Sequence, residues 1–191
     1  MNNKYAIISP KIEAITNKLK EIGYELIYTD CVDEFISYEK HHADMQCFNF
    51  DNRIIVLKNC ENLYNTLRAY GFNVIKTTQI ACGEYPDNIK LNTITFDKTM
   101  IGNIQHIDES LIELAKSKNY KFINVKQGYT KCSSCKISEN AVITSDKSIY
   151  NSLKDIIDVL IINEGHIKLY DSKRGGPTKN SSFFKSVSFI P

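Results

Sequence analysis

Apolar side chains near the start of the chain change from a helical to a strand-like spacing. Between Lys11 and Ile22 they recur every three or four residues, which predicts a helix with one apolar face (Ile12, Ile15, Leu19 and Ile22). Pro10 suits the first turn of this helix, and Ser9 suits its N-cap. The apolar run over 24–28 then predicts a strand, so the chain opens with a helix followed by a strand.

The same helix end and strand return at a fixed interval. Gly23 follows the first predicted helix, Gly71 lies 48 residues further on, and Asn119 lies 48 residues beyond Gly71. Gly and Asn best tolerate the left-handed backbone found at a helix C-terminus. An acidic residue at a predicted hairpin turn recurs with them (Asp51, Asp97 and Glu139). Such a period is typical of repeat and propeller proteins, although an α/β chain can also contain helix–glycine–strand units by chance.

The pattern predicts four α/β modules, at about 1–58, 59–103, 104–144 and 145–169. The predicted helices cover 11–22, 61–70, 109–118 and 147–156, and Asp108 and Asp146 are expected to cap the last two. The predicted strands cover 5–9, 24–28, 43–50, 53–57, 72–76, 89–96, 99–103, 120–125, 132–137, 141–144 and 158–162. Residues 170–191 are turn-rich and polar at first, and we interpret them as a divergent or truncated C-terminal tail.

Composition limits the classes of function. The 191 residues suit one domain, and 42% hydrophobic residues are enough for a core. The net charge is only +2 and Lys and Glu are spread along the chain, so nothing indicates a nucleic-acid partner. No apolar run approaches the roughly 18 residues of a membrane helix, and none at the start is long enough for a signal peptide. Six scattered cysteines without a secretion signal indicate reduced thiols and a cytoplasmic protein.

Polar clusters stand at the end of a loop of variable length in each module, just before a predicted strand. If the modules are related by rotation, these clusters meet at one end of a shared axis. A thiolate needs a nearby cation at neutral pH, and a carboxylate suits a planar guanidinium held by two hydrogen bonds. The pattern therefore predicts thiol chemistry at this axis. The expected catalytic residues are Cys132, His166 and Asp44, and the expected substrate contacts are His42, Asn88 and Ser133.

Simpler interpretations remain open for the same residues. His42 could be solvated, Asp44 could cap a turn, and Cys132 could be a small buried apolar residue. Cys132 and Cys135 also have the spacing of a zinc-binding pair, but a structural zinc site needs two further ligands from other modules. The segment Lys173–Pro177 lacks the full phosphate-loop pattern. We therefore expect no cofactor and no resident metal, and a small metal-binding domain is the third hypothesis.

A wider likeness is carried by Ile36–Tyr38 with His42–Asp44, Tyr85–Ile89, Asn124–Ser133, Ile143–Asp146 and Gly165–Ile167. In these stretches the chain resembles an uncharacterised bacterial family with the pentein fold. That fold is the five-module ββαβ propeller of guanidino-group-modifying enzymes, which include arginine and agmatine deiminases, dimethylarginine hydrolases and amidinotransferases. The resemblance covers most of residues 1–169, is most specific over Asn124–Ser133, and ends at about Tyr170.

The resemblance implies a pentein-like α/β propeller that is incomplete or divergent at its C-terminus. Enzymes of this fold use a cysteine nucleophile, a histidine and acidic residues, and they form a covalent thiouronium intermediate. The implied function is that of a guanidino-modifying hydrolase or amidinotransferase, catalytic or degenerate, with a small guanidino-type ligand at Asp44, His166 and Cys132. The alternative is a non-catalytic ligand-binding or assembly module. Unpaired strand edges in an open propeller favour a homodimer under either hypothesis.

Overall fold

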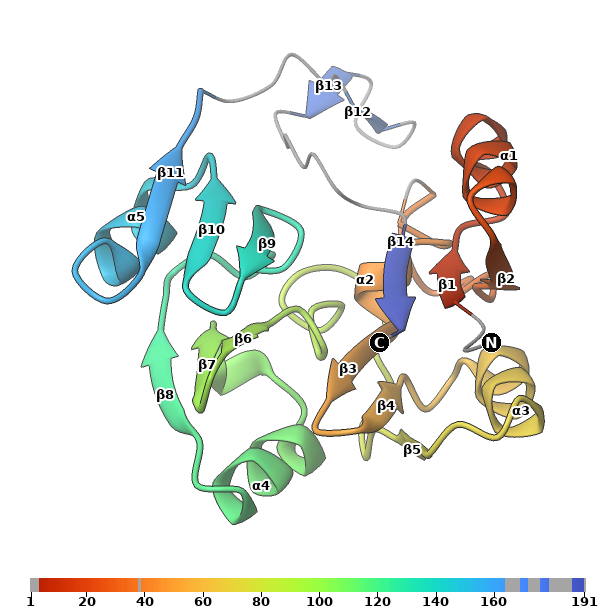
Figure 1. Cartoon of the computed structure of the whole chain (residues 1–191), viewed down its shortest axis with the longest axis horizontal. Helices are drawn as coiled ribbons and strands as arrows, with labels where there is room; N and C mark the ends of the chain where they lie inside the picture. The colour runs from red at the N-terminus through yellow and green to blue at the C-terminus, as the bar shows by residue number, and fades with distance from the viewer. Residues whose placement is uncertain (1–3, 38, 164–168, 172–175, 179–186, 191) are drawn as a thin grey trace.

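Short strands and helices alternate along most of the chain (Figure 1). This computed structural model describes residues 4–37, 39–163, 169–171, 176–178 and 187–190. The helices are α1 (Glu13–Glu21), α2 (Ala43–Gln46), α3 (Glu61–Ala69), α4 (Glu109–Ser117), α5 (Lys147–Leu153) and the 3₁₀ helix η1 (Ile104–His106). The strands are β1 (Lys4–Ile8), β2 (Tyr24–Tyr28), β3 (Cys47–Phe50), β4 (Arg53–Val56), β5 (Val74–Lys76), β6 (Ile94–Phe96), β7 (Thr99–Gly102), β8 (Lys121–Asn124), β9 (Ser134–Ser138), β10 (Ala141–Thr144), β11 (Asp158–Ile161), β12 (Leu169–Asp171), β13 (Gly176–Thr178) and β14 (Val187–Ile190).

Four three-stranded sheets share one construction. A hairpin pairs the first two strands antiparallel, and the chain then returns through a helix so that the third strand lies parallel to the second. This describes β3–β4–β5, β6–β7–β8 and β9–β10–β11. In the fourth sheet, β14 takes the place of the first hairpin strand and pairs antiparallel with β1, so that Tyr5 faces Ile190. The first and last described strands of the chain are therefore neighbours.

The sheets are arranged around the centre of the molecule. In Figure 1 they follow one another in chain order from β1 and β2 to the β12–β13 hairpin, with α1, α3, α4 and α5 on the outside. The short helix α2 and the loop before β6 lie near the middle of the view. Among the described residues, no helix has the length and apolarity needed to cross a membrane.

The 48-residue period is visible in the backbone. Gly23, Gly71 and Asn119 have φ angles of 87°, 86° and 59°, and each follows a helix of nine residues. The left-handed conformation lets the chain turn sharply from the helix into the next strand. The three helix ends are therefore equivalent, as the sequence spacing predicts.

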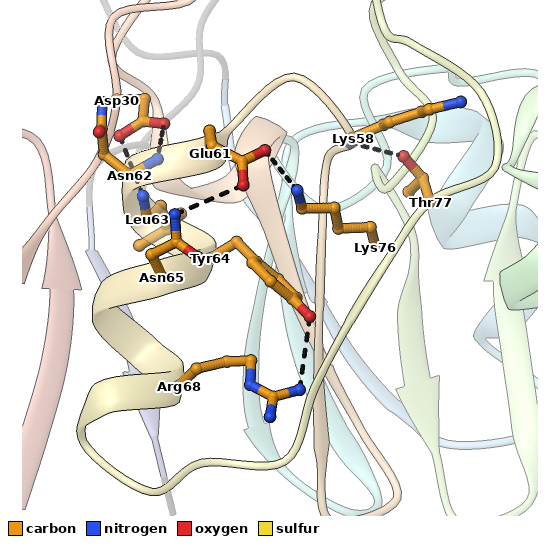
Figure 2. A network of polar contacts seen from close by, with 10 residues as sticks. All are labelled: Asp30, Lys58, Glu61, Asn62, Leu63, Tyr64, Asn65, Arg68, Lys76 and Thr77. Carbon is orange, nitrogen blue, oxygen red and sulfur yellow. Dashed lines mark hydrogen bonds and ion pairs between the residues drawn. The ribbon is translucent and has the colours of Figure 1, made fainter.

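Acidic side chains join neighbouring modules. Asp30, in the loop after β2, accepts hydrogen bonds from the backbone N–H groups of Asn62 (3.0 Å) and Leu63 (3.1 Å) in the first turn of α3 (Figure 2). The same turn carries Glu61, which forms an ion pair with Lys76 on β5 (Figure 2). The N-terminus of α3 is thus satisfied by a carboxylate from the preceding module.

Asp108 and Asp146 connect the next two helices to the loops before them. Asp108 caps α4 by accepting from the Ser110 backbone N–H (3.0 Å), as predicted, and it also accepts from the backbone N–H groups of Thr78 (3.2 Å) and Gln79 (3.0 Å) after β5. Asp146 caps α5 by accepting from the Ile149 backbone N–H, and it also accepts from the Gln127 side chain in the loop after β8. Each of the three carboxylates therefore joins the loop after a parallel strand to the first turn of a following helix.

Most buried apolar side chains gather in one cluster that spans the sheets β3–β4–β5 and the elements around it. Its members include Ile27, Ile55, Leu63, Leu67, Met100 and Leu111. A second cluster lies under α5 (Val142, Ile149 and Leu153), and a third lies under α1 (Ala6, Ile8 and Leu19). Polar side chains buried beside the largest cluster are therefore surrounded by apolar groups.

Several predicted boundaries were wrong: α5 ends at Leu153, β5 begins at Val74 and β9 begins at Ser134. Three further differences are larger. Helix α1 begins at Glu13 with Ile12 at its N-cap, and Ser9 instead accepts a hydrogen bond from the Lys11 backbone. Residues 43–46, predicted as strand, form α2 because the carbonyl of His42 accepts from two backbone N–H groups three and four positions on. Residues 89–93, also predicted as strand, form turns closed by local backbone bonds, and β6 starts only at Ile94.

Candidate functional site

Three loops supply polar side chains to one buried cluster. They join β2 to α2, β5 to β6 and β8 to β9, and each leads into the first hairpin of a sheet. An isolated bridge between Phe35 and Gly83 ties the first loop to the second. Since each loop occupies an equivalent place in its module, side chains far apart in the sequence reach the same region.

Cys132 and Asp44 form the centre of this cluster. The Cys132 Sγ donates a hydrogen bond to the Asp44 Oδ2 at 2.6 Å, and the two residues are only 2% and 3% exposed. The other carboxylate oxygen, Oδ1, is buried and has no hydrogen-bond partner among the described residues. A thiol and a carboxylate are thus held together away from water, with one carboxylate oxygen unsatisfied.

Asn92, in the loop between β5 and β6, connects helix α2 with the loop between β8 and β9. Its Oδ1 accepts from the backbone N–H groups of Lys131 (2.8 Å) and Cys132 (3.3 Å). Its Nδ2 donates to the Cys132 Sγ (2.9 Å) and to the Sδ of Met45 (3.1 Å), and the two sulfur atoms lie 3.9 Å apart. Asn92 is fully buried, so each of these bonds lies inside the protein.

A second polar group, Glu39, Asn88 and Tyr129, lies in the same loops. The Asn88 Nδ2 donates to the Glu39 Oε2 (2.8 Å) and to the Tyr129 hydroxyl (2.7 Å). Burial, together with the charge of Glu39, raises the pKa of Tyr129 well above its ordinary value, so its hydroxyl stays protonated. Asn88 Oδ1, like Asp44 Oδ1, is buried without a partner in the described part of the chain.

Tyr85 covers Tyr129 from the outside. The two rings are stacked with centroids 6.0 Å apart, and Tyr85 is about half exposed. This packing requires a glycine at position 128, because a Cβ there would lie 2.2 Å from Tyr85 Cε2 and 2.9 Å from Ile89 Cδ1. The Tyr85 ring therefore packs both on the Tyr129 ring and against the Gly128 backbone.

Lys131 brings a positive charge close to the cluster. Its Nζ donates to the backbone carbonyl of Cys47 at 2.9 Å and lies over the Phe48 ring. Burial raises the pKa of the Cys47 thiol to about 11, so this cysteine is neutral at physiological pH. Of the two buried thiols here, only Cys132 is bonded to a carboxylate.

The structure brings together some of the predicted site residues. Asp44 and Cys132 are in direct contact, whereas Asn88 belongs to the separate polar group with Glu39 and Tyr129. Ser133 contributes backbone bonds, to Tyr129 and Thr144.

His42 is the N-cap of α2, and its carbonyl holds the turn that carries Asp44. His166, predicted to be catalytic, lies outside the described residues.

Sequence analysis missed Asn92, Met45, Glu39 and Tyr129. Asn92 stands in a run of alternating apolar residues that favours an exposed strand face, and the other three carry no spacing signal. In the described part of the chain no three His, Cys, Asp or Glu side chains are grouped so as to hold a metal ion. Cys135 lies on β9, and burial raises the pKa of its thiol.

A family model covers nearly the whole chain. The model of a family of unknown function (DUF6873) matches residues 7–176. The chain belongs to this family. A search of curated proteins finds no match.

Two solved structures are similar to this DUF6873 chain. One is SxtG, an amidinotransferase from Microseira wollei in the saxitoxin biosynthetic pathway, with 12% sequence identity, a TM-score of 0.49, and coverage of 82% of this chain and 60% of that chain. The other is the C. jejuni agmatine deiminase, with 14% identity, a TM-score of 0.44, and coverage of 92% and 75%. The chain thus spans about 60% of the length of the amidinotransferase.

Proposed function

We propose that Asp44 binds the guanidino or amidino group of a small molecule and that Cys132 is the thiol that reacts with it. One observation carries this proposal. A buried carboxylate has one oxygen bonded to a thiol and its second oxygen without a partner among the described residues. Such an arrangement suits a ligand that supplies hydrogen-bond donors at the position where the sulfur also lies.

The charge of the site favours a cation. Within the described residues Asp44 has no ion pair, since the ion pairs there involve other carboxylates. Leaving a buried acceptor unsatisfied costs about 1–3 kcal/mol, and more when the group is charged. A guanidinium carries a positive charge and offers only donors, two of which can meet one carboxylate in parallel. Its binding would satisfy Asp44 Oδ1 and offset the buried negative charge.

The position of the sulfur supports chemistry beyond binding. Because Sγ is bonded to the carboxylate that would hold the ligand, a guanidino group at Asp44 lies next to the thiol. Attack on its electron-poor carbon requires the thiolate. A bound cation reduces the repulsion between a thiolate and the neighbouring carboxylate, so the ligand itself would promote the reactive form of Cys132.

A pair of alkylating reagents tests the proposal. Chloroacetamidine is cationic and chloroacetamide is its neutral counterpart, so the ratio of their reaction rates at one cysteine reports recognition of the amidinium group. Mass spectrometry of the Cys132 peptide should give a ratio at least about tenfold higher than that of exposed Cys82, since tenfold corresponds to only 1.4 kcal/mol. Asp44→Asn removes the carboxylate that would bind the amidinium group, so it should lower the ratio at Cys132 to that at Cys82. Equal ratios at Cys132 and Cys82 in the unchanged protein would reject the proposal.

A second candidate function is binding without chemistry. It is favoured by the burial of the sulfur, because Cys132 is only 2% exposed and buried cysteines are commonly unreactive. A binding protein would be stabilised by agmatine or arginine equally with and without the thiol. Thermal unfolding of the unchanged protein and of Cys132→Ser with these ligands measures this stabilisation. Equal stabilisation of the two proteins, together with no amidine preference at Cys132 in the unchanged protein, would favour binding without chemistry.

We further propose that the sheets are successive modules of a pentein-like propeller. Support comes from the repeated ββαβ order, the repeated left-handed helix ends and the pairing of β14 with β1. The β12–β13 hairpin would be the reduced fifth module. An experimental structure in which the backbone of β3–β5 fails to superpose on that of β6–β8 and β9–β11 after rotation about one axis would reject this fold.

A further inference from the structure

The orientation of the Asn92 side chain is fixed by its partners. Two backbone N–H groups, those of Lys131 and Cys132, face one end of the amide. That end must be the oxygen, because a flipped amide would place donors against donors. The NH₂ group is therefore directed at the Cys132 Sγ and the Met45 Sδ. Both lone-pair sites and both hydrogens of this buried amide are used.

The bonds around the sulfur form a directed chain. Asn92 donates to the Cys132 Sγ, and the Sγ donates to the Asp44 Oδ2. If the thiol proton passes to Asp44, the sulfur loses its own donor but keeps the bond from Asn92. That bond then becomes charge-assisted and about twice as strong. Asn92 thus favours the anionic sulfur, and an ionised Asp44 opposes it.

We infer that Asn92 is a positioning residue, which holds the Cys132 sulfur beside Asp44 and stabilises that sulfur once its proton has left. The inference deepens the proposed function, since it concerns the same thiol, but its test needs no guanidino compound. Alkylation by neutral chloroacetamide is the probe reaction. The S–C bond forms as the C–Cl bond breaks, chloride leaves with the electron pair, and the thiol proton passes to Asp44 and then to solvent.

The experiment measures the chloroacetamide labelling rate of the Cys132 peptide from about pH 6 to pH 10, a range that spans the ordinary thiol titration. Asn92→Asp retains an acceptor for Lys131 and Cys132 but removes the donor to sulfur. It should slow labelling at pH 8 by about tenfold or more and move the half-maximal rate to higher pH, because the charge-assisted bond is lost and a second carboxylate faces the sulfur. Asn92→Leu removes the same donor without adding a charge, so it should move the profile in the same direction. Asp44→Asn should move the profile in the opposite direction.

Met45→Leu is the matched control, because it disturbs the same buried contact but leaves the bond from Asn92 to Cys132 in place. Its profile should stay within about twofold of the unchanged protein. A purely structural role for Asn92 predicts similar profiles for Asn92→Asp and Met45→Leu, or faster labelling as the site loosens, and either result overturns the inference. Asn92→Leu and Asn92→Ser, with thermal unfolding of each variant, decide the question if Asn92→Asp does not fold.

The two proposals fail in different ways. Loss of the amidine preference at Cys132 with a normal response to Asn92→Asp would reject the proposed function and keep the positioning role. A clear amidine preference with no response to Asn92→Asp would do the reverse. No labelling of Cys132 at any pH by either reagent would overturn both.

Discussion

Replacing Asp108 with alanine should destabilise the protein more than an ordinary loss of a helix cap. Asp108 is fully buried, and its carboxylate accepts from three backbone N–H groups, those of Ser110, Thr78 and Gln79. The loss of an N-cap costs about 1 kcal/mol. Each buried N–H group left without a partner costs about 1–3 kcal/mol, although these costs do not add fully. We expect Asp108→Ala to lower the free energy of unfolding by roughly 3–5 kcal/mol.

Urea unfolding at neutral pH measures this cost, and Asp146→Ala is the matched control. Asp146 caps α5 through one backbone N–H group, that of Ile149, and its only other partner among the described residues' side chains is the partly buried Gln127. Its loss should therefore cost only about 1–2 kcal/mol. If Asp108→Ala costs no more than Asp146→Ala, the contact between Asp108 and the loop after β5 does not stabilise the fold.

The stabilising effect of Asp108 also depends on pH. Burial acts to raise the pKa of Asp108, but hydrogen bonds from Ser110, Gln79 and Thr78 together lower it below the ordinary value of 3.8. A folded-state pKa below the unfolded one gives stability that is present above the unfolded value and lost as pH falls through the folded value. The stability difference between the unchanged protein and Asp108→Asn should therefore be constant at neutral pH and shrink below about pH 4. A difference that stays constant down to about pH 2 would contradict this sign.

Three further substitutions test the packing around the modules. Gly128→Ala should displace Tyr85 and cost about 1–3 kcal/mol, and adding Tyr85→Ala should recover part of that cost in a double-mutant cycle. Gly71→Ala should lower the free energy of unfolding by about 1 kcal/mol, because φ is positive at Gly71 while no atom lies within 4 Å of a new Cβ. Gly71→Asn should cost less, since Asn tolerates positive φ, and equal costs for the two variants would argue against a backbone origin. Deleting 187–191 removes the strand paired with β1 and should lower the unfolding free energy by at least about 2 kcal/mol, whereas an unchanged urea midpoint would show that this pairing adds no stability.

Local signals predicted most elements because each has a local cause. The left-handed helix ends follow from Gly71 and its equivalents, and the caps of α4 and α5 follow from Asp108 and Asp146. The strand β14 had no local signal, since its position depends on pairing with β1 from the other end of the chain. The strand predicted over 89–93 was wrong because alternating apolar residues there are buried by long-range packing rather than by a strand pleat.

The repeat predicted that Asp44 and Cys132 would lie close together, but it did not predict which other side chains would join them. Asp44, Asn92 and Cys132 stand three, two and two residues before the first hairpin strand of successive sheets. Equivalent positions in repeated modules lie at the same end of each module, so side chains about 40 to 48 residues apart meet at the centre. Their chemistry differs because each module contributes a single group: a carboxylate, an amide or a thiol. Changing one of these positions should therefore alter the site while leaving the module that carries it folded, which is why Asp44, Asn92 and Cys132 can be tested separately.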